Sequence, residues 1–258
     1  MNSKIALIAC GSYNPPTLTH LRMFEIARDH FQMQGAHHVI GGIISPTHDG
    51  YIKEGLAPGV HRRAMVELAV KSSSWIRVSE WEIVKPQWSQ TVDVLEHHQN
   101  CINNAITGDS NEHMPGWLPD GLCDTKDKVQ LKFLCGADLL ESFAVPGLWP
   151  NEHVMEIVGN YGLVVVSRSG SNPEGFIAAS DILTKYQHNV SLITDPIPNR
   201  VSSTMIRQAV GRGQSVKYLI DELVLEYIKT NGLYNFKSKI LIIYLKKTNF
   251  KNLLKNFI

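Results

Sequence analysis

Five short apolar runs rich in β-branched residues constrain the fold of this 258-residue chain more than any other feature. Runs of this kind are typical of strands that are buried on both faces of a parallel sheet. They cover residues 5–10, 39–44, 131–135, 163–166 and 190–193. Between the runs, apolar residues recur every three or four positions, as at Leu21, Phe24, Ala27 and Phe31, which indicates helices. Strands that alternate with helices predict an α/β fold with a parallel sheet and right-handed crossovers.

Two segments fall outside this alternation. Residues 100–128 are polar, rich in Gly, Pro, Asn and Asp, and too long for an ordinary connection in a compact domain. We interpret them as a mobile insertion. Residues 198–236 have a helical pattern, with helices expected over 203–212 and 221–230. They predict a small helical cap rather than a second full domain.

The charge of the chain is divided unevenly along its length. Residues 237–258 contain six lysines and no acidic residue, so we treat them as a tail. The domain over residues 1–236 has 19 basic and 24 acidic residues, a net charge of −5. A domain of this sign is poorly suited to general nucleic-acid binding, which depends on clustered Lys and Arg. We expect no nucleic-acid partner, and any bound phosphate must be held in a shaped pocket.

The tail combines its lysines with a continuous apolar run over residues 240–245. A basic amphipathic segment of this kind can dock on an anionic membrane surface. Polar residues interrupt the tail too often for it to cross a bilayer. We expect an end that is disordered or packs weakly on the domain, and the alternative is weak contact with a membrane surface.

The cysteines and the N-terminus bear on the compartment. Cys10, Cys101, Cys123 and Cys135 have neither C-x-x-C spacing nor the regular spacing of a disulfide scaffold or zinc site, so we expect reduced thiols. Residues 1–4 lead directly into the first predicted strand, without the pattern of a signal peptide or presequence. The prediction is a cytoplasmic protein, with the nucleus as the alternative.

The first predicted strand ends in a loop that leads into a helix. In an open α/β sheet, ligands bind beyond the carboxyl ends of the strands, where this loop lies. Gly11 allows a close approach of the backbone, Thr17 can cap the helix, and His20 falls in its first turn. The N–H groups and dipole of a helix N-terminus favour phosphate. The loop predicts an anion site, against the alternative of a Pro-terminated loop with a surface histidine.

A second candidate site opens the predicted helix over 203–212. Its first turn offers N–H groups without helical partners, and Arg207 lies three residues after Thr204, on the same face. Two helix N-termini can flank one polyphosphate. Taken by itself, the segment is also explained as a Ser-capped helix with a solvated arginine.

These two sites carry a family resemblance. Thr17 to His20 hold the place of an (H/T)-x-G-H motif, and residues 203–207 that of an S-x-x-x-(I/L)-R motif. With these motifs the chain resembles the nicotinamide mononucleotide adenylyltransferase family of the nucleotidyltransferase superfamily. The resemblance to the animal enzymes covers most of residues 4–235. Its longest stretches are 11–30, 41–56, 81–98, 133–149, 160–168 and 213–220.

The resemblance implies a Rossmann-like doubly wound parallel sheet of the nucleotidyltransferase type, with a small C-terminal helical subdomain. It also implies an activity. The AMP moiety of ATP would be transferred to nicotinamide mononucleotide, and to nicotinate mononucleotide, forming NAD or deamido-NAD and pyrophosphate. Mg²⁺ would be carried mainly by ATP oxygens, with no protein metal ligand. We expect these small molecules as partners, and a homo-oligomer.

The resemblance assigns site residues in two groups, with His20 and Arg207 as the catalytic pair. For ATP it implies contacts from Gly11, Ser12, His20, Gly136, Asp138, Asn199, Ser203, Thr204, Met205, Ile206 and Arg207. For the mononucleotide and the dinucleotide it implies contacts from Ser12, Tyr13, Tyr51, Lys53, Trp88, Thr91, Leu148, Trp149, Arg168 and Asp195. From composition alone, Trp88 would be a core residue, and Arg168 and Asp195 surface charges at strand ends.

The chain departs from the family pattern at three positions. Thr19 replaces the usual Gly of the first motif, which the animal enzymes also tend to lack. Tyr13 stands where Phe is common, and Glu54 follows Lys53 where relatives often have a second Lys. A carboxylate repels phosphate, so Glu54 is not expected to bind ATP.

Other functions fit less of the sequence. A cytidylyltransferase or a pantetheine-phosphate adenylyltransferase would share the phosphate motifs, but neither is expected to match the segments around Trp88 and Trp149. A class I aminoacyl-tRNA synthetase is disfavoured, because the domain is acidic and because 258 residues leave no room for a tRNA-binding module. A chaperone-like protein-binding role, beside or instead of catalysis, is the alternative from another class, motivated by the insertion and the tail.

Overall fold

The computed structural model describes residues 3–108, 114–122, 125, 127–167, 171–197 and 199–236. Within them lies one six-stranded parallel sheet in the order β3-β2-β1-β4-β5-β6. The strands are β1 (Ser3–Gly11), β2 (His37–Pro46), β3 (Ile76–Val78), β4 (Val129–Gly136), β5 (Leu163–Ser167) and β6 (Val190–Thr194). All five predicted strands are confirmed, and the three-residue edge strand β3 was missed. The strand order and flanking helices confirm the predicted doubly wound α/β fold.

Helices connect successive strands. Those of the first half are α1 (Leu18–Gln34), α2 (Gly59–Ala69), α3 (Trp81–Val84) and α4 (Thr91–Thr107). Those that follow β4 and β5 are α5 (Ala137–Ser142), α6 (Asn151–Glu156), the π-helix η1 (Ile157–Tyr161), α7 (Pro173–Ala178), α8 (Asp181–Lys185) and the 3₁₀ turn η2 (Gln187–Asn189). The last are α9 (Ser203–Gly211), α10 (Glu222–Thr230) and the 3₁₀ turn η3 (Leu233–Asn235). None of the described helices is long and apolar enough to cross a membrane.

Each face of the sheet has its own apolar core. Helices α1 and α2 cover one face, where Phe24, Phe31 and Val66 pack against strand residues such as Leu7. Helices α4, α5, α6 and α8 cover the other face, together with residues 114–122. Burial on both faces explains why the strands are continuous apolar runs rather than alternating ones.

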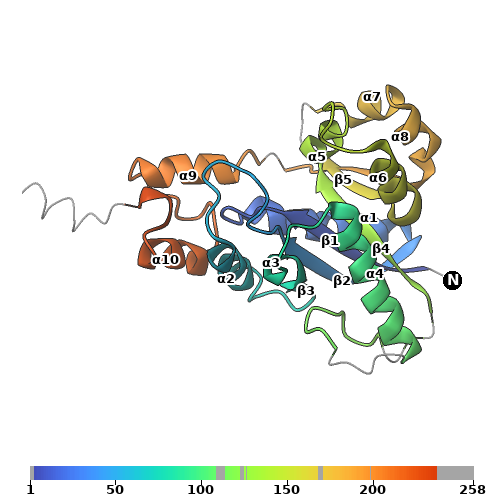
Figure 1. Cartoon of the computed structure of the whole chain (residues 1–258), viewed down its shortest axis with the longest axis horizontal. Helices are drawn as coiled ribbons and strands as arrows, with labels where there is room; N and C mark the ends of the chain where they lie inside the picture. The colour runs from blue at the N-terminus through green and yellow to red at the C-terminus, as the bar shows by residue number, and fades with distance from the viewer. Residues whose placement is uncertain are drawn as a thin grey trace, which may run out of the picture.

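The C-terminal helices form the predicted cap at one end of the molecule. Figure 1 shows α9 and α10 beside α2, far from α7 and α8. Ile206, Val210, Val224 and Ile228 of the two cap helices pack on Met65 of α2. Because this packing ties the cap to the first half of the chain, the N-terminus of α9 comes to lie against the loop after β1. The tail lies outside the described residues.

The expected insertion over residues 100–128 is wrong in its first part. Helix α4 continues through Thr107, and its apolar face buries Ile102 and Ala105. Trp117 and Leu118, farther along, are also buried in the core on that face of the sheet. The polar Asn and Gln side chains of this helix conceal an amphipathic pattern that the core makes evident.

A buried histidine connects α4 to the edge of the sheet. His98 has no exposed surface, its Nδ1–H donates to the Val94 carbonyl (2.6 Å), and its Nε2 accepts from the Ser79 hydroxyl (2.8 Å). His97 and Trp117 flank the ring. Burial lowers the pKa of His98 from its ordinary 6.5 to about 4. The His98 ring is therefore neutral in the folded protein at neutral pH.

Acid should destabilise the chain through this histidine. Its folded pKa lies below the unfolded value, so the unfolded chain binds the extra proton and stability falls as the pH drops from 6.5 to about 4. The expected loss is about 3 kcal/mol. Urea unfolding across this pH range should show a shallower acid loss in His98→Gln than in wild type. The exposed His38→Gln should follow wild type, and equal slopes for His98→Gln and wild type would contradict the assignment.

Candidate active site

The predicted site residues gather at the carboxyl edge of the sheet. There the strand order turns outward from β1 and β4, which is where open α/β sheets bind ligands. Gly11 at the end of β1 pairs with Pro46 at the end of β2. The first loop (residues 12–17) and the second loop (residues 47–58) therefore leave neighbouring strands side by side.

The first loop ends at the N-terminus of α1, where His20 closes a capping box. Thr17 is the N-cap, and its backbone N–H donates to Nδ1 of His20 at 2.9 Å. The Thr17 hydroxyl lies 2.8 Å from the same nitrogen. Because a backbone N–H can only donate, Nδ1 is an acceptor and the proton of the neutral ring is on Nε2. The prediction that His20 lies in the first turn of the helix is confirmed. The hydrogen bond from Thr17 then shows which nitrogen of the neutral ring carries the proton.

Tyr13 supports His20 from behind. Its side chain is 5% exposed, its hydroxyl donates to the Ala9 carbonyl, and its ring meets the His20 ring edge to face at 5.2 Å. The hydroxyl that distinguishes Tyr13 from the common Phe is thus satisfied inside the protein. What Tyr13 offers a ligand is its backbone, at a φ of 44°.

The N-terminus of α9 lies against the first loop. The Ser203 hydroxyl donates to the Pro15 carbonyl at 2.8 Å, and the Thr19 hydroxyl to the Val201 carbonyl at 3.2 Å. The two helix N-termini predicted to flank one polyphosphate are therefore neighbours. Ser202, the N-cap of α9, accepts from the N–H of Met205. Ile206 is buried in the cap, so only its backbone can serve a ligand.

Arg207 joins α9 to the same loop. One of its terminal nitrogens donates to the Asn14 carbonyl at 2.9 Å and the other reaches Thr204 Oγ1 at 3.4 Å. The predicted shared face of Thr204 and Arg207 is confirmed. These bonds hold the guanidinium beside the N-termini of both helices, which is where a triphosphate would need positive charge.

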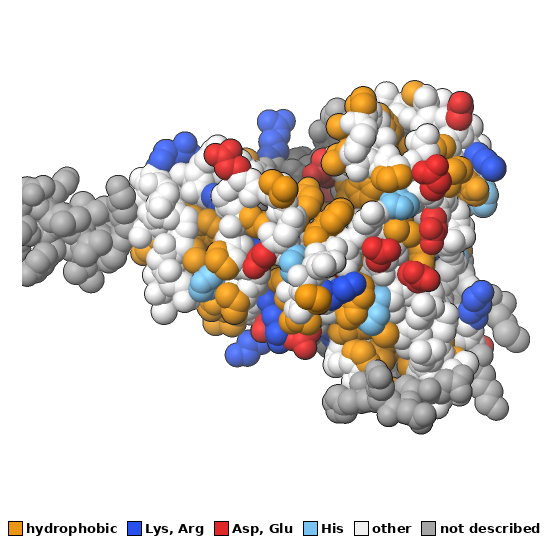
Figure 2. Space-filling view, in the orientation of Figure 1, with side chains coloured by type: hydrophobic (Ala, Val, Ile, Leu, Met, Phe, Trp, Pro, Cys, Tyr) orange, Lys and Arg blue, Asp and Glu red, His pale blue; other side chains and the backbone are white. Residues whose placement is uncertain are grey.

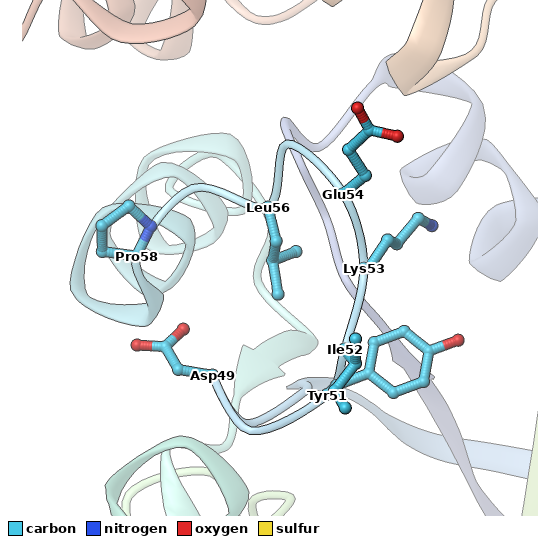
Figure 3. A pocket seen from close by; sticks show the side chains of 7 residues that line it. All are labelled: Asp49, Tyr51, Ile52, Lys53, Glu54, Leu56 and Pro58. Carbon is cyan, nitrogen blue, oxygen red and sulfur yellow. The ribbon is translucent and has the colours of Figure 1, made fainter.

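The second loop carries Tyr51 and Lys53 toward the first. Lys53 Nζ donates to Ser12 Oγ at 3.4 Å, so the cation expected for the mononucleotide phosphate lies beside the ATP loop. The loop borders an open hollow of about 580 Å³ (Figure 3). Lys53 and Glu54 extend from the same stretch of this loop, while Asp49 lies on the opposite side. The negative charge of Glu54 therefore lies next to Lys53, the cation predicted to bind the mononucleotide phosphate.

A buried arginine that the motifs do not contain joins the two loops. Arg62 on α2 has no exposed surface. Its guanidinium donates to three backbone carbonyls, those of Ser12 (3.0 Å), Thr47 (2.7 Å) and Ala57 (2.8 Å), and to the Asp49 carboxylate (2.8 Å). One side chain thereby fixes both ends of the second loop to the first.

Asn14 makes the complementary connection from the first loop. It is fully buried, and its Nδ2 donates to the Gly55 carbonyl at 2.8 Å. Its Oδ1 accepts from the Ala57 N–H (3.1 Å) and from the Tyr234 hydroxyl (2.9 Å). Burial raises the pKa of Tyr234, which keeps this phenol a donor. The side-chain amide of Asn14 therefore connects the first loop to the second loop and to the C-terminal cap.

The residues expected around the nicotinamide ring lie in two segments of the chain, residues 88–91 at the start of α4 and residues 148–149 between α5 and α6. Trp88 is 47% exposed and lies against Gly50 of the second loop, so it is not a core residue. Thr91 opens α4. Leu148 is 53% exposed, whereas Trp149 packs on Phe143 and donates from its indole to Ser142. An exposed tryptophan at a ligand-binding edge suits a stacking platform.

The remaining predicted residues follow β4, β5 and β6. Gly136 caps α5, and a Cβ there would come within 2.5 Å of an Asp138 carboxylate oxygen, so a larger residue would require the Asp138 side chain to move. The Asp195 and Asn199 side chains accept from the backbone N–H groups of Ile197 and Val201. Arg168 lies outside the described residues.

The described residues contain neither a metal-ligand cluster nor, on the face shown in Figure 2, a broad basic patch. Within the part of the chain that the structure describes, no group of three or more His, Cys, Asp or Glu side chains could hold a metal ion. Figure 2 shows Lys and Arg side chains scattered over one face rather than joined in a broad patch.

Comparisons with known proteins agree with this geometry. The cytidylyltransferase-like family profile matches residues 8–209. A Drosophila melanogaster protein named nicotinamide-nucleotide adenylyltransferase is 63% identical over 92% of this chain, which spans 62% of that protein's length. A Bos taurus protein named nicotinamide/nicotinic acid mononucleotide adenylyltransferase 1 is 42% identical over 92% of this chain and 91% of its own.

Solved structures support the fold independently. A Plasmodium falciparum nicotinic acid mononucleotide adenylyltransferase, solved in complex with NaAD, superposes with a TM-score of 0.60 at 17% identity, covering 91% of this chain and 98% of that one. At such low identity the match concerns the architecture alone. Together with the family profile and the near full-length match to the bovine protein, the findings show that the chain belongs to the nicotinamide/nicotinic acid mononucleotide adenylyltransferase family.

Proposed function

We propose that this chain transfers the AMP moiety of ATP to nicotinamide mononucleotide and to nicotinate mononucleotide, releasing pyrophosphate and forming NAD or deamido-NAD. The observation that carries the proposal is the meeting of three anion-binding features at one edge. His20 at the start of α1 and Arg207 on α9 share the first loop, and Lys53 reaches Ser12 of that loop from the other side.

The reaction needs positioning more than proton transfer. The second pKa of a phosphate monoester is about 6, so the mononucleotide phosphate is already a dianion at neutral pH. One of its oxygens attacks the α-phosphorus of ATP, the bond from that phosphorus to the bridging oxygen breaks, and pyrophosphate leaves with the electron pair. The site must hold two anions in line and stabilise the charge that develops on the leaving group.

The residues divide this work between the two loops. Lys53 supports the attacking phosphate, while His20, Arg207 and the N-termini of α1 and α9 face the triphosphate. Because Nδ1 of His20 is occupied by the Thr17 N–H, the histidine can donate only from Nε2. Mg²⁺ would arrive with ATP, bound to its oxygens and to water, and would neutralise phosphate charge.

The test is pyrophosphate release from ATP with each mononucleotide. We expect turnover with both, and little turnover when EDTA removes the divalent ion. With nicotinamide mononucleotide, one NAD should form for each pyrophosphate released, and with nicotinate mononucleotide, one deamido-NAD. ATP turnover that continues without either mononucleotide, or no turnover with both, would reject the function.

Lys53→Ala should weaken mononucleotide use selectively. Loss of one charge-assisted contact to phosphate is expected to raise KM for nicotinamide mononucleotide by about tenfold or more, with a smaller change in KM for ATP. Steady-state kinetics with each substrate varied in turn would measure both values. Lys71→Ala removes an exposed lysine just after α2 and should leave both unchanged. Equal rises in the two KM values would contradict the assignment of Lys53.

Self-association and membrane-surface contact stay predictions. The tail on which the membrane prediction depends lies outside the described residues, and the relatives' names describe the chemistry alone.

A further inference from the structure

A buried carboxylate lies below the second loop and belongs to neither motif. Glu82, on the short helix α3, is 3% exposed. A carboxylate in the protein interior is costly unless hydrogen bonds and an opposite charge compensate it. The surroundings of Glu82 supply both, and they are directed at the start of the loop that carries Tyr51 and Lys53.

Three donors from one stretch of chain bind the Glu82 carboxylate. Oε1 accepts from the Thr47 hydroxyl at 2.8 Å and from the His48 N–H at 3.3 Å. Oε2 accepts from the Ser45 hydroxyl at 3.2 Å. An ionised carboxylate only accepts hydrogen bonds, so its chemistry matches this set.

Arg62 holds the same stretch from the other side. Its guanidinium binds the Thr47 carbonyl and the Asp49 carboxylate, while Glu82 binds the Thr47 hydroxyl. Burial raises the pKa of Glu82, and its bonds to Thr47, His48 and Ser45, together with the charge of Arg62, oppose that rise. Thr47 is thus held by Arg62 through its backbone carbonyl and by Glu82 through its hydroxyl.

The bonds of Glu82 to Thr47 and His48 lie at the start of the loop that carries Lys53. The second loop leaves the sheet at Thr47, and Tyr51 and Lys53 follow within six residues. Figure 3 shows the chain curving from Asp49 around the hollow to Lys53. With the far end of the loop held at Gly55 and Ala57, the direction in which residues 47–49 leave β2 helps to set where the Lys53 ammonium lies. Displacements of about 1 Å suffice to weaken a positioned ionic contact severely.

We infer that Glu82 is a positioning residue for the mononucleotide phosphate, acting through Thr47 and His48 on the loop that carries Lys53. The inference rests on the proposed function of the site. It assigns no contact between Glu82 and a substrate. It also predicts that loss of Glu82 affects the mononucleotide more than ATP. Glu82 bonds to the start of the second loop, whereas the predicted triphosphate contacts lie on the first loop and α9.

Two substitutions of Glu82 test the role. Glu82→Ala should raise KM for nicotinamide mononucleotide by about tenfold and KM for ATP by less than about threefold. Glu82→Gln should recover most of the loss, because its amide oxygen can accept from Thr47 and His48 while Ser45 Oγ accepts from the amide nitrogen. Glu80→Ala is the matched control, since this carboxylate is half exposed and pairs with Arg63 on the surface.

A second variant protects the test against misfolding of Glu82→Ala. Thr47→Val removes the hydroxyl that donates to Oε1 and should give the same selective rise in KM. The double variant with Glu82→Ala should fall well short of the product of the single effects, because both substitutions remove the same interaction. If Thr47→Val changes thermal stability but neither KM value, Glu82 is structural only and the inference fails.

The control with wild type separates this inference from the proposed function. An active wild type whose Glu82 and Thr47 variants raise both KM values equally overturns the positioning role alone. A wild type that neither releases pyrophosphate nor binds nicotinamide mononucleotide in calorimetry overturns the proposed function, and the positioning role with it. A wild type that binds without turnover still tests the role, through a tenfold weaker Kd in Thr47→Val.

Discussion

Replacing His20 by alanine should lower kcat for pyrophosphate release by about 10²- to 10³-fold, the usual cost of one donor to developing charge. The ring stands in the first turn of α1, with Nδ1 occupied by the Thr17 N–H, so Nε2 is the atom that can donate to phosphate. KM for ATP should change less, because Arg207 and the N-terminus of α9 still hold the triphosphate.

The fold should survive this substitution. Loss of a capping interaction costs about 1 kcal/mol, and α1 keeps its buried face of Phe24, Ala27 and Phe31. Steady-state kinetics and thermal unfolding of the same preparations measure the two effects. His38→Ala, at an exposed position on β2, should leave kcat unchanged. A near-normal kcat in His20→Ala would remove His20 from the mechanism.

Arg62→Met should produce the largest loss of stability, about 3–5 kcal/mol, because each buried carbonyl left without a donor costs about 1–3 kcal/mol. The substitution keeps much of the apolar stem but leaves the buried carbonyls of Thr47 and Ala57, the half-buried carbonyl of Ser12 and the Asp49 carboxylate without their donor. Since these groups belong to both loops, the folded fraction should also bind nucleotides poorly. Urea unfolding followed by tryptophan fluorescence measures the change.

The neighbouring arginine provides the matched control. Arg63 is half exposed and pairs with Glu67 and Glu80 on the surface. Surface ion pairs contribute less than about 1 kcal/mol, so Arg63→Met should differ little from wild type. If the two substitutions destabilise equally, the account of Arg62 as the buried connection between the loops is wrong.

The fold was largely predictable because its main signal is local. Strands such as β1 and β5 are buried on both faces, so their apolar runs need no partner to be recognised. Strand β3 was missed because three residues are too few for a periodic signal. The end of α4 was misjudged because its many polar side chains obscure the few buried positions, such as Ile102 and Ala105.

The motif residues of the site were also predictable, because each depends on its own turn of chain. His20 and Thr17 lie three residues apart in one helical turn, and Thr204 and Arg207 in another. Arg62 left a fainter signal. It shares the spacing of Met65, Val66 and Ala69, so a charged residue occupies the apolar stripe of α2. Such a residue must find buried partners, which sequence spacing cannot name.

The sequence by itself determined the parallel α/β sheet, the two helix N-termini and the residues that begin those helices. Each of these follows from hydrophobic periodicity or from capping, which operate over a few residues. Only the tertiary structure decided that α9 meets the first loop, that Lys53 lies beside Ser12, and that Arg62, Asn14 and Glu82 hold the loops. These contacts join residues that are distant in the chain, and they exist because buried polar groups must be satisfied wherever packing brings them together.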